Sequence, residues 1–135
     1  VVKVDENIKE KEIFLEIDSI DESDWEKLEN SMVSVISDWR GTAFNLNEIA
    51  KNKIAGKTGT AQIKSLTDEE LTVKEEYEDI RQEVRNRDHA LFVGYGPIPE
   101  PKLTVVVIVE NGESGSAIAA PIAQKLIDKY LSKYN

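Results

Sequence analysis

The stretch that decides the fold is Ile54-Ala55-Gly56-Lys57-Thr58-Gly59-Thr60-Ala61-Gln62. It lies in a segment, residues 53–64, that reads as a strand but carries two glycines, a pattern typical of strands that another backbone approaches closely. A phosphate-binding loop ending in Gly56-Lys57-Thr58 is an alternative, but that motif needs a glycine where Lys51 stands. It must also open a helix, whereas residues 60–63 continue the strand pattern. The stretch therefore predicts a glycine-bearing strand.

The Lys57-Thr58-Gly59 triplet and its neighbour Thr60 supply groups with which this strand can bind a substrate. Gly59 has no side chain, so a substrate peptide can lie against the strand and pair with it. Thr58 and Thr60 share a face at positions i and i+2, so both hydroxyls can meet a carboxylate. Lys57 adds a positive charge, and a backbone N–H can help to form an oxyanion hole. The alternative is an exposed strand whose glycines have no binding role. The surrounding sequence distinguishes the two interpretations.

A helix is expected before this strand, over residues 23–40. Ser23 and Glu26 fit a capping box, and Gly41 is placed to supply a left-handed C-terminal cap. The helical spacing produces one apolar stripe, made of Trp25, Leu28, Met32, Val35, Ile36 and Trp39. We expect both tryptophans to pack in the core.

Two strands and a helix are expected after it. Residues 90–96 and 103–109 are apolar and joined by the proline-rich link 97–101, which favours an antiparallel pair. The second strand is apolar throughout, so we expect it to be central and covered on both faces. A last helix is predicted from residue 116 to the end, with an apolar face of Ile118, Ile122, Leu126, Ile127, Tyr130, Leu131 and Tyr134.

Two further segments complete the prediction. Residues 1–20 read as a hairpin, and residues 67–88 as an inserted acidic helix whose charges form a solvated face rather than a catalytic pair. The fold class predicted from these elements is α+β, an antiparallel sheet flanked by helices, with a helix from each end covering one face.

Composition excludes several classes of function. The chain has 135 residues, a size typical of one domain, and a net charge of −9, which argues against a general nucleic-acid-binding surface. The absence of cysteine excludes a disulfide scaffold, a thiolate metal site and a Cys nucleophile. A single histidine, His89, excludes a multi-His metal site, and we expect it to be structural rather than a general base.

The surroundings of the triplet resemble a known family. Residues 54–62 resemble the third catalytic motif of class B penicillin-binding proteins. Residues 87–95 resemble the strand that follows it, and residues 107–112 the next strand and its exit; Gly41-Thr42-Ala43 also fits. The resemblance covers nearly the whole chain and is nearer to the elongation enzymes of the family than to the division enzymes.

The resemblance implies that residues 1–135 are the C-terminal part of a penicillin-binding/β-lactamase-like transpeptidase domain. The implied activity is that of a peptidoglycan D,D-transpeptidase, in which a serine attacks the D-Ala-D-Ala bond of a stem peptide and which β-lactams acylate. By the same resemblance, Lys57, Thr58, Gly59 and Thr60 form the substrate-binding strand. The two hydroxyls hold the carboxylate, and the Thr60 backbone N–H is half of the oxyanion hole.

The resemblance also implies partners and a location. The partners are the stem peptide, β-lactams, the rest of the transpeptidase domain and membrane proteins of the elongation complex, with no nucleic acid, cofactor or metal. The expected location is the bacterial cytoplasmic membrane, with the catalytic domain on its outer side.

One part of the family pattern is missing. No serine in the chain has Lys three places on or Asn two places on, so neither a Ser-x-x-Lys nor a Ser-x-Asn motif is present. Together with the absence of Met at position 1, this predicts that the nucleophile lies in sequence before Val1 and that the chain alone is inactive. The alternatives are a piece of a serine β-lactamase or penicillin sensor, and a non-catalytic binding module.

Overall fold

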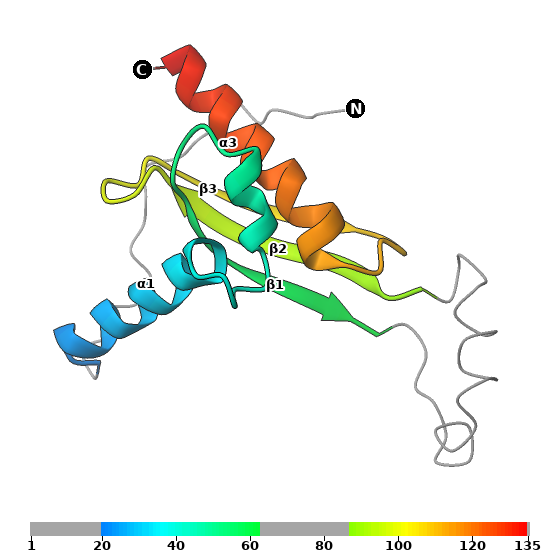
Figure 1. Cartoon of the computed structure of the whole chain (residues 1–135), viewed down its shortest axis with the longest axis horizontal. Helices are drawn as coiled ribbons and strands as arrows, with labels where there is room; N and C mark the ends of the chain where they lie inside the picture. The colour runs from blue at the N-terminus through cyan, green and yellow to red at the C-terminus, as the bar shows by residue number, and fades with distance from the viewer. Residues whose placement is uncertain (1–19, 63–86, 135) are drawn as a thin grey trace, which may run out of the picture.

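The structure is a computed structural model that describes residues 20–62 and 87–134. Its elements in chain order are helix α1 (Glu22–Ser37), the 3-10 turn η1 (Phe44–Glu48), strands β1 (Ala55–Ala61), β2 (His89–Gly96) and β3 (Leu103–Val109), the π-type turn η4 (Gly115–Ala119) and helix α3 (Ala120–Tyr134) (Figure 1). The predicted hairpin over 1–20 and the predicted acidic helix over 67–88 lie outside the described residues except at their last positions.

The three strands form one antiparallel sheet in the order β1-β2-β3. β1 pairs with β2 from Ala55 opposite Tyr95 to Ala61 opposite His89, and β3 continues the sheet beyond β2. This confirms the predicted fold class and the antiparallel pair joined by residues 97–101.

Among the strands that the structure describes, β2 lies between the other two, so the prediction that residues 103–109 form the central strand stays a prediction, because residues 1–19 lie outside the described part of the chain. Val106 is 65% exposed and Ile108 is 62% exposed, so the described residues cover only one face of β3. An unbroken apolar run does not show which part of the chain covers the second face of the strand. The run therefore predicts a strand but not its place in the sheet.

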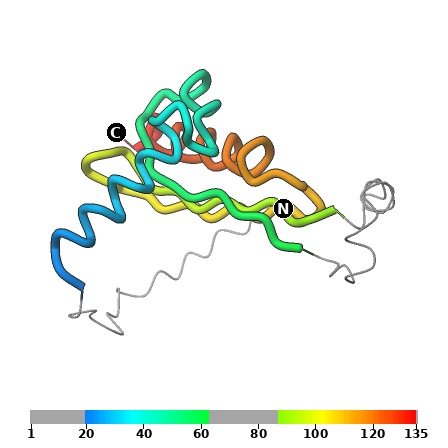
Figure 2. Tube along the Cα trace, turned by 60° about the horizontal axis from the view of Figure 1, so that its bottom comes forward, coloured from blue at the N-terminus to red at the C-terminus, as the bar shows by residue number. Residues whose placement is uncertain are grey.

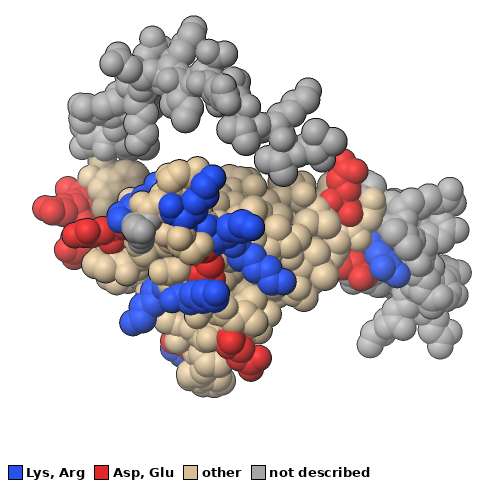
Figure 3. All heavy atoms as spheres, turned by 90° about the horizontal axis from the view of Figure 1, so that it is seen from above, with Lys and Arg blue, Asp and Glu red and all other residues tan. Residues whose placement is uncertain are grey.

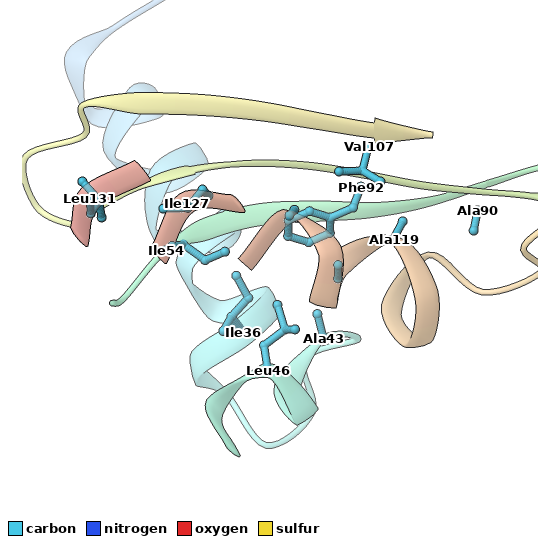
Figure 4. Packing of buried hydrophobic residues seen from close by; sticks show 12 residues of the cluster. Ile36, Ala43, Leu46, Ile54, Ala90, Phe92, Val107, Ala119, Ile127 and Leu131 are labelled. Atoms are coloured by element: carbon cyan, nitrogen blue, oxygen red, sulfur yellow. The ribbon is translucent and has the colours of Figure 1, made fainter. Parts of the chain in front are cut away.

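A single core lies on one face of this sheet. Phe92 of β2 and Val107 of β3 point into it, and the end of α1, η1, η4 and α3 cover them (Figure 4). The cluster consists of Ile36, Ala43, Leu46, Ile54, Ala90, Phe92, Val107, Ala119, Ala120, Ala123, Ile127 and Leu131. The prediction that helices cover both faces is therefore not met by the described helices, which build their core on one face.

Two facing glycines make room for the largest buried side chain. Gly56 of β1 lies opposite Gly94 of β2, and the ring of Phe92 lies against both. A Cβ atom on Gly56 would lie 2.4 Å from Cζ of Phe92, and one on Gly94 would lie 2.6 Å from Cε1. The glycine at 56 is thus required by an aromatic ring as well as by neighbouring backbone.

Helix α1 differs from its prediction at both ends. It begins at Glu22, after Asp21, and no side chain caps it, so the capping box at Ser23 is not formed. It ends at Ser37, and no described glycine has a positive φ, so Gly41 is not a left-handed cap. A Cβ atom on Gly41 would lie 2.3 Å from the carbonyl oxygen of Val35, so close packing on the end of the helix is what requires glycine there.

The prediction that both tryptophans are buried is also wrong. Trp25 is 44% exposed and Trp39 is 78% exposed. The tube in Figure 2 shows why, since α1 passes the edge of the sheet and only its C-terminal end reaches the core. Ile36 is the residue of α1 that is fully buried. A helical stripe identifies the apolar side of a helix but not how much of its length meets the sheet.

Helix α3 packs through two residues of the predicted face, Ile127 and Leu131, together with small residues that were not part of it. Its buried positions are Ala120, Ala123, Gln124, Ile127 and Leu131. Of the residues predicted to face the core, Ile118, Ile122, Leu126, Tyr130 and Tyr134 are exposed. Alanines bring the helix axis close to the sheet, and the larger apolar residues then lie on its flank. No helix within residues 20–62 and 87–134 is long and apolar enough to cross a membrane.

Candidate substrate-binding strand

The register of β1 separates its side chains into two faces. Thr58 lies opposite Phe92 and Thr60 opposite Ala90, and both partners belong to the buried core. Directly opposed residues of an antiparallel pair share a face, so both threonines lie on the side of the sheet that carries the helices. This confirms that the two hydroxyls share a face. The side chain of Lys57 leaves the strand on the opposite face, because successive side chains alternate.

The backbone of β1 presents groups at the open edge of the described sheet. The carbonyl oxygen of Thr58 accepts a hydrogen bond from Nζ of Lys57 at 2.7 Å. The N–H and C=O of one strand residue point to the same side, and this direction repeats every second residue. We infer that the backbone groups of Thr58 and Thr60 point away from β2. Strand β1 continues past Thr58 to Ala61, so the Gly56-Lys57-Thr58 stretch does not open a helix. The phosphate-binding-loop alternative is thereby excluded.

The hydroxyl of Thr58 meets a second hydroxyl from the loop before η1. Oγ1 of Thr58 and Oγ1 of Thr42 lie 2.9 Å apart. Thr42 is held there because the N–H of Ala43 donates to the carbonyl of Val35, and because Gly41 packs on the same turn of α1. Reasoning from sequence noted Thr42 only within a resemblance and missed this contact, since no spacing rule brings residues 16 positions apart together.

The start of η4 closes the same face. A Cβ atom on Gly115 would lie 2.6 Å from the carbonyl oxygen of Gly59 and 2.4 Å from that of Leu91, so η4 begins directly on the β1–β2 ladder. Ser114 caps this turn by accepting from the N–H of Ala117 at 3.1 Å. This close approach requires glycine at 115, whereas a Cβ atom on Gly59 would meet Cβ of Leu91 at 3.3 Å.

His89 has a structural role in this fold. Its Nδ1 accepts a hydrogen bond from the backbone N–H of Asn111 at 3.0 Å, at the exit of β3. Asn111 has φ 57°, in the left-handed region, and its Nδ2 donates to the carbonyl of Arg87. The histidine therefore ties the end of β3 to the start of β2, which agrees with the structural role expected for it.

The loop between α1 and Thr42 holds one strongly paired carboxylate. Arg40 donates from Nη2 to Asp38 at 2.9 Å and from its backbone N–H to the same carboxylate at 2.9 Å. These hydrogen bonds lower the pKa of Asp38 to about 2. Arg40 also lies over the ring of Trp39, 5.7 Å from its centroid. Its charge is therefore already engaged next to the strand, and Lys57 remains the cation of the motif.

The arrangement suits the binding of an extended, anionic peptide. Two hydroxyls face one side, an ammonium group lies at the strand, and backbone donors point outward from an edge with little side-chain bulk. Within the described part of the chain, no three His, Cys, Asp or Glu residues are placed to hold a metal ion. Lys57, Thr58, Gly59 and Thr60 therefore have the geometry that a peptide-binding strand needs.

The fold and this strand are those of one enzyme family. Residues 2–128 match the penicillin-binding protein transpeptidase domain, and the chain belongs to that family. Among curated proteins it is similar to the peptidoglycan D,D-transpeptidase MrdA of Haemophilus influenzae, with 38% identity over 81% of this chain and 16% of that protein. The MrdA of Acinetobacter baumannii is 36% identical over 82% of this chain and 15% of its own length.

Solved structures lead to the same branch of the family. Pseudomonas aeruginosa PBP2 in complex with WCK 5153 matches with a TM-score of 0.64 and 37% identity, over 82% of this chain and 20% of that chain. PBP2 from Helicobacter pylori, in its complex with MreC, matches with a TM-score of 0.65 and 27% identity, over 83% of this chain and 18% of that chain. The chain thus spans about one sixth of the curated relatives and one fifth of the solved ones.

Proposed function

We propose that the protein carrying this chain is a serine-type peptidoglycan D,D-transpeptidase of the PBP2 type. The observation that supports this most is the Lys57-Thr58-Gly59-Thr60 strand, with Thr58 and Thr60 on one face and Thr42 against Thr58. The named relatives are D,D-transpeptidases, and the match extends over about four fifths of the chain. A serine β-lactamase, a penicillin sensor and a non-catalytic module are less well supported by these relatives.

In the proposed reaction this chain binds and polarises, and a serine outside it attacks. The serine adds to the carbonyl of the penultimate D-Ala, the terminal D-Ala leaves, and an amine of a second stem peptide then takes the acyl group. Lys57 attracts the terminal carboxylate, and Thr58 and Thr60 donate hydrogen bonds to it. The Thr60 N–H stabilises the negative charge that develops on the carbonyl oxygen.

The hydroxyl pair has a defined direction in this proposal. A carboxylate only accepts hydrogen bonds, so the Thr58 hydroxyl must donate its proton to the substrate. The Thr42 hydroxyl must then donate to Thr58 across their 2.9 Å contact. Thr42 would in this way fix the rotamer of Thr58 before substrate arrives, which lowers the cost of binding.

The location and partners follow from the family as a proposal. The full protein is anchored in the cytoplasmic membrane with its transpeptidase domain outside. It acts on stem peptides, is acylated by β-lactams, and associates with membrane proteins of cell elongation. The H. pylori relative was solved with MreC, which supports a protein partner of this kind.

A substitution at Thr58 tests the proposal in the full-length protein. Thr58→Val keeps the volume but removes the hydroxyl, so the rate of labelling by a fluorescent penicillin should fall roughly 10- to 100-fold, the loss expected for one hydrogen bond to a charged group. Thr58→Ser keeps the hydroxyl and should stay within about threefold of the wild type. Equal labelling of wild type and Thr58→Val would contradict the assigned role.

A further inference from the structure

Helix α3 holds the backbone just before β1 through one asparagine. Both the backbone N–H and Nδ2 of Asn52 donate to Oδ1 of Asp128, at 3.0 and 2.7 Å. Nε2 of Gln124 donates to the carbonyl oxygen of Asn52 at 3.1 Å. The N–H of Lys51 donates to the second carboxylate oxygen of Asp128 at 3.2 Å. The main-chain donor, the main-chain acceptor and the side chain of Asn52 are therefore all held by α3.

The two α3 residues are themselves rigidly placed. Gln124 is 0% exposed, in line with Ala123 and Ile127 of the core. Its Nε2 also donates to Oδ2 of Asp128 at 3.1 Å, which orients the carboxylate. Oε1 of Gln124 is buried without a hydrogen-bond partner in the described residues, a position that costs free energy. What the amide contributes is therefore its two donor contacts, to Asn52 and to Asp128.

Asn52 lies in the middle of the segment that brings the two site hydroxyls together. This segment runs from Thr42 through η1 to Thr58, and the 2.9 Å contact of its end residues closes it. Its first part is fixed on α1 through the N–H of Ala43, and its last part by the N–H of Ile98, which donates to the carbonyl of Lys53 at 2.9 Å. The contacts of Asn52 with α3 fix the part between them.

Asp128 shares a hollow with three lysines but forms no ion pair with them in the part of the chain that the structure describes. Basic side chains gather on the face that carries α3 (Figure 3), and Lys51, Lys125 and Lys129 line one hollow with Asp128. In the described part of the chain the hydrogen bonds of its carboxylate go to backbone N–H groups and side-chain amides. Its carboxylate therefore holds the backbone of residues 51 and 52 rather than a lysine.

We propose that Asp128, oriented by Gln124, is a positioning residue that sets Thr42 and Thr58 for carboxylate binding. This inference rests on the proposed function, and Asp128 itself does not touch the substrate. Loss of the carboxylate frees residues 51–52 from α3, so the segment between the two threonines can shift. A distant substitution that misplaces a site group by about 1 Å can lower the rate up to about 100-fold.

The test uses the full-length protein and a fluorescent penicillin. For each variant the number of sites that can be labelled is titrated, and the second-order acylation constant is then measured per titrated site. Asp128→Ala should lower this constant about tenfold and leave the titre unchanged. Asp128→Asn keeps an accepting oxygen for Asn52 but places an NH2 group against the donors of Gln124 and Lys51, so it should recover only part of the loss. Lys125→Ala, an exposed change on the same helix, should match the wild type.

Each possible result either supports or overturns the role proposed for Asp128. A lower titre and melting temperature with an unchanged constant per site would show a merely structural residue and overturn the proposal. If Asp128→Ala does not fold, Asn52→Ala removes the 2.7 Å contact alone and should lower the constant about threefold; an unchanged constant would again overturn it. A wild-type protein that takes up no label would instead reject the proposed function, and this inference with it.

Discussion

Gly56 and Gly94 show how single residues connect the core to the binding strand. They face each other across β1 and β2, and the ring of Phe92 occupies the space that side chains at both positions would take. Gly56 directly precedes Lys57, so a change that displaces the ring also displaces the start of the motif. Packing and binding are therefore coupled at this position.

Gly56→Ala should destabilise the protein by about 1–3 kcal/mol, because the new methyl group overlaps the Phe92 ring. Gly59→Ala is the matched control in the same strand, since its Cβ atom would meet Cβ of Leu91 at 3.3 Å, which needs only a small shift. The measurement is the thermal unfolding midpoint of the full-length protein. A midpoint for Gly56→Ala equal to that of Gly59→Ala would refute the packing argument.

Asp38 provides a prediction about pH. Its pKa in the folded protein is about 2, below the ordinary value of 3.8, because Arg40 donates hydrogen bonds to the charged form. The pair is therefore fully formed above about pH 4, and its contribution is lost as the pH falls towards 2. Carboxyl NMR with 13C-labelled aspartate should find a midpoint near 2 that returns to the ordinary range in Arg40→Ala. A normal midpoint in the unmodified protein would contradict the pairing.

Helix α3 makes contacts that its apolar stripe does not predict. Ile127 is 0% exposed against the sheet, whereas the neighbouring Leu126 is 50% exposed on the flank. The same helix supplies Gln124 and Asp128, which hold the segment before β1. One helix thus supports the sheet and the approach to the binding strand.

Ile127→Ala should cost about 2–5 kcal/mol, the range for truncating a buried aliphatic side chain. Leu126→Ala removes a side chain of the same size from a half-exposed place and should cost less than about 1 kcal/mol. Urea unfolding of the full-length protein, followed in parallel for the two variants, measures the difference. Similar losses for both would mean that the helix packs with a different face.

The elements and the motif could be predicted from sequence, but their depth in the fold could not. Alternation and proline spacing predict β2, β3 and their antiparallel link, and the triplet predicts a strand with both threonines on one face. The helical stripe predicts Trp39 in the core, but Trp39 is 78% exposed, because periodicity does not tell how far a helix overlaps its sheet. The Thr42–Thr58 pair depends on a loop closing over 16 residues, which no local pattern encodes.

At the scale of the whole molecule, we propose that the described residues form one wall of a site. The apolar outer face of β3 and the open edge of β1 are both left uncovered by residues 20–62 and 87–134. The chain spans about one sixth of its curated relatives, and it contains no Ser-x-x-Lys. We therefore propose that the nucleophile comes from another part of the same protein and meets the binding strand across a cleft.

Mapping the penicilloyl group in the full-length protein distinguishes this arrangement from its alternatives. After labelling with a penicillin and proteolysis, mass spectrometry locates the modified residue. The label should lie on a serine outside residues 1–135, and Thr58→Val should slow its appearance. A label on any residue within 1–135, or one that forms equally fast in Thr58→Val, would contradict the proposal that this chain supplies the binding strand but not the nucleophile.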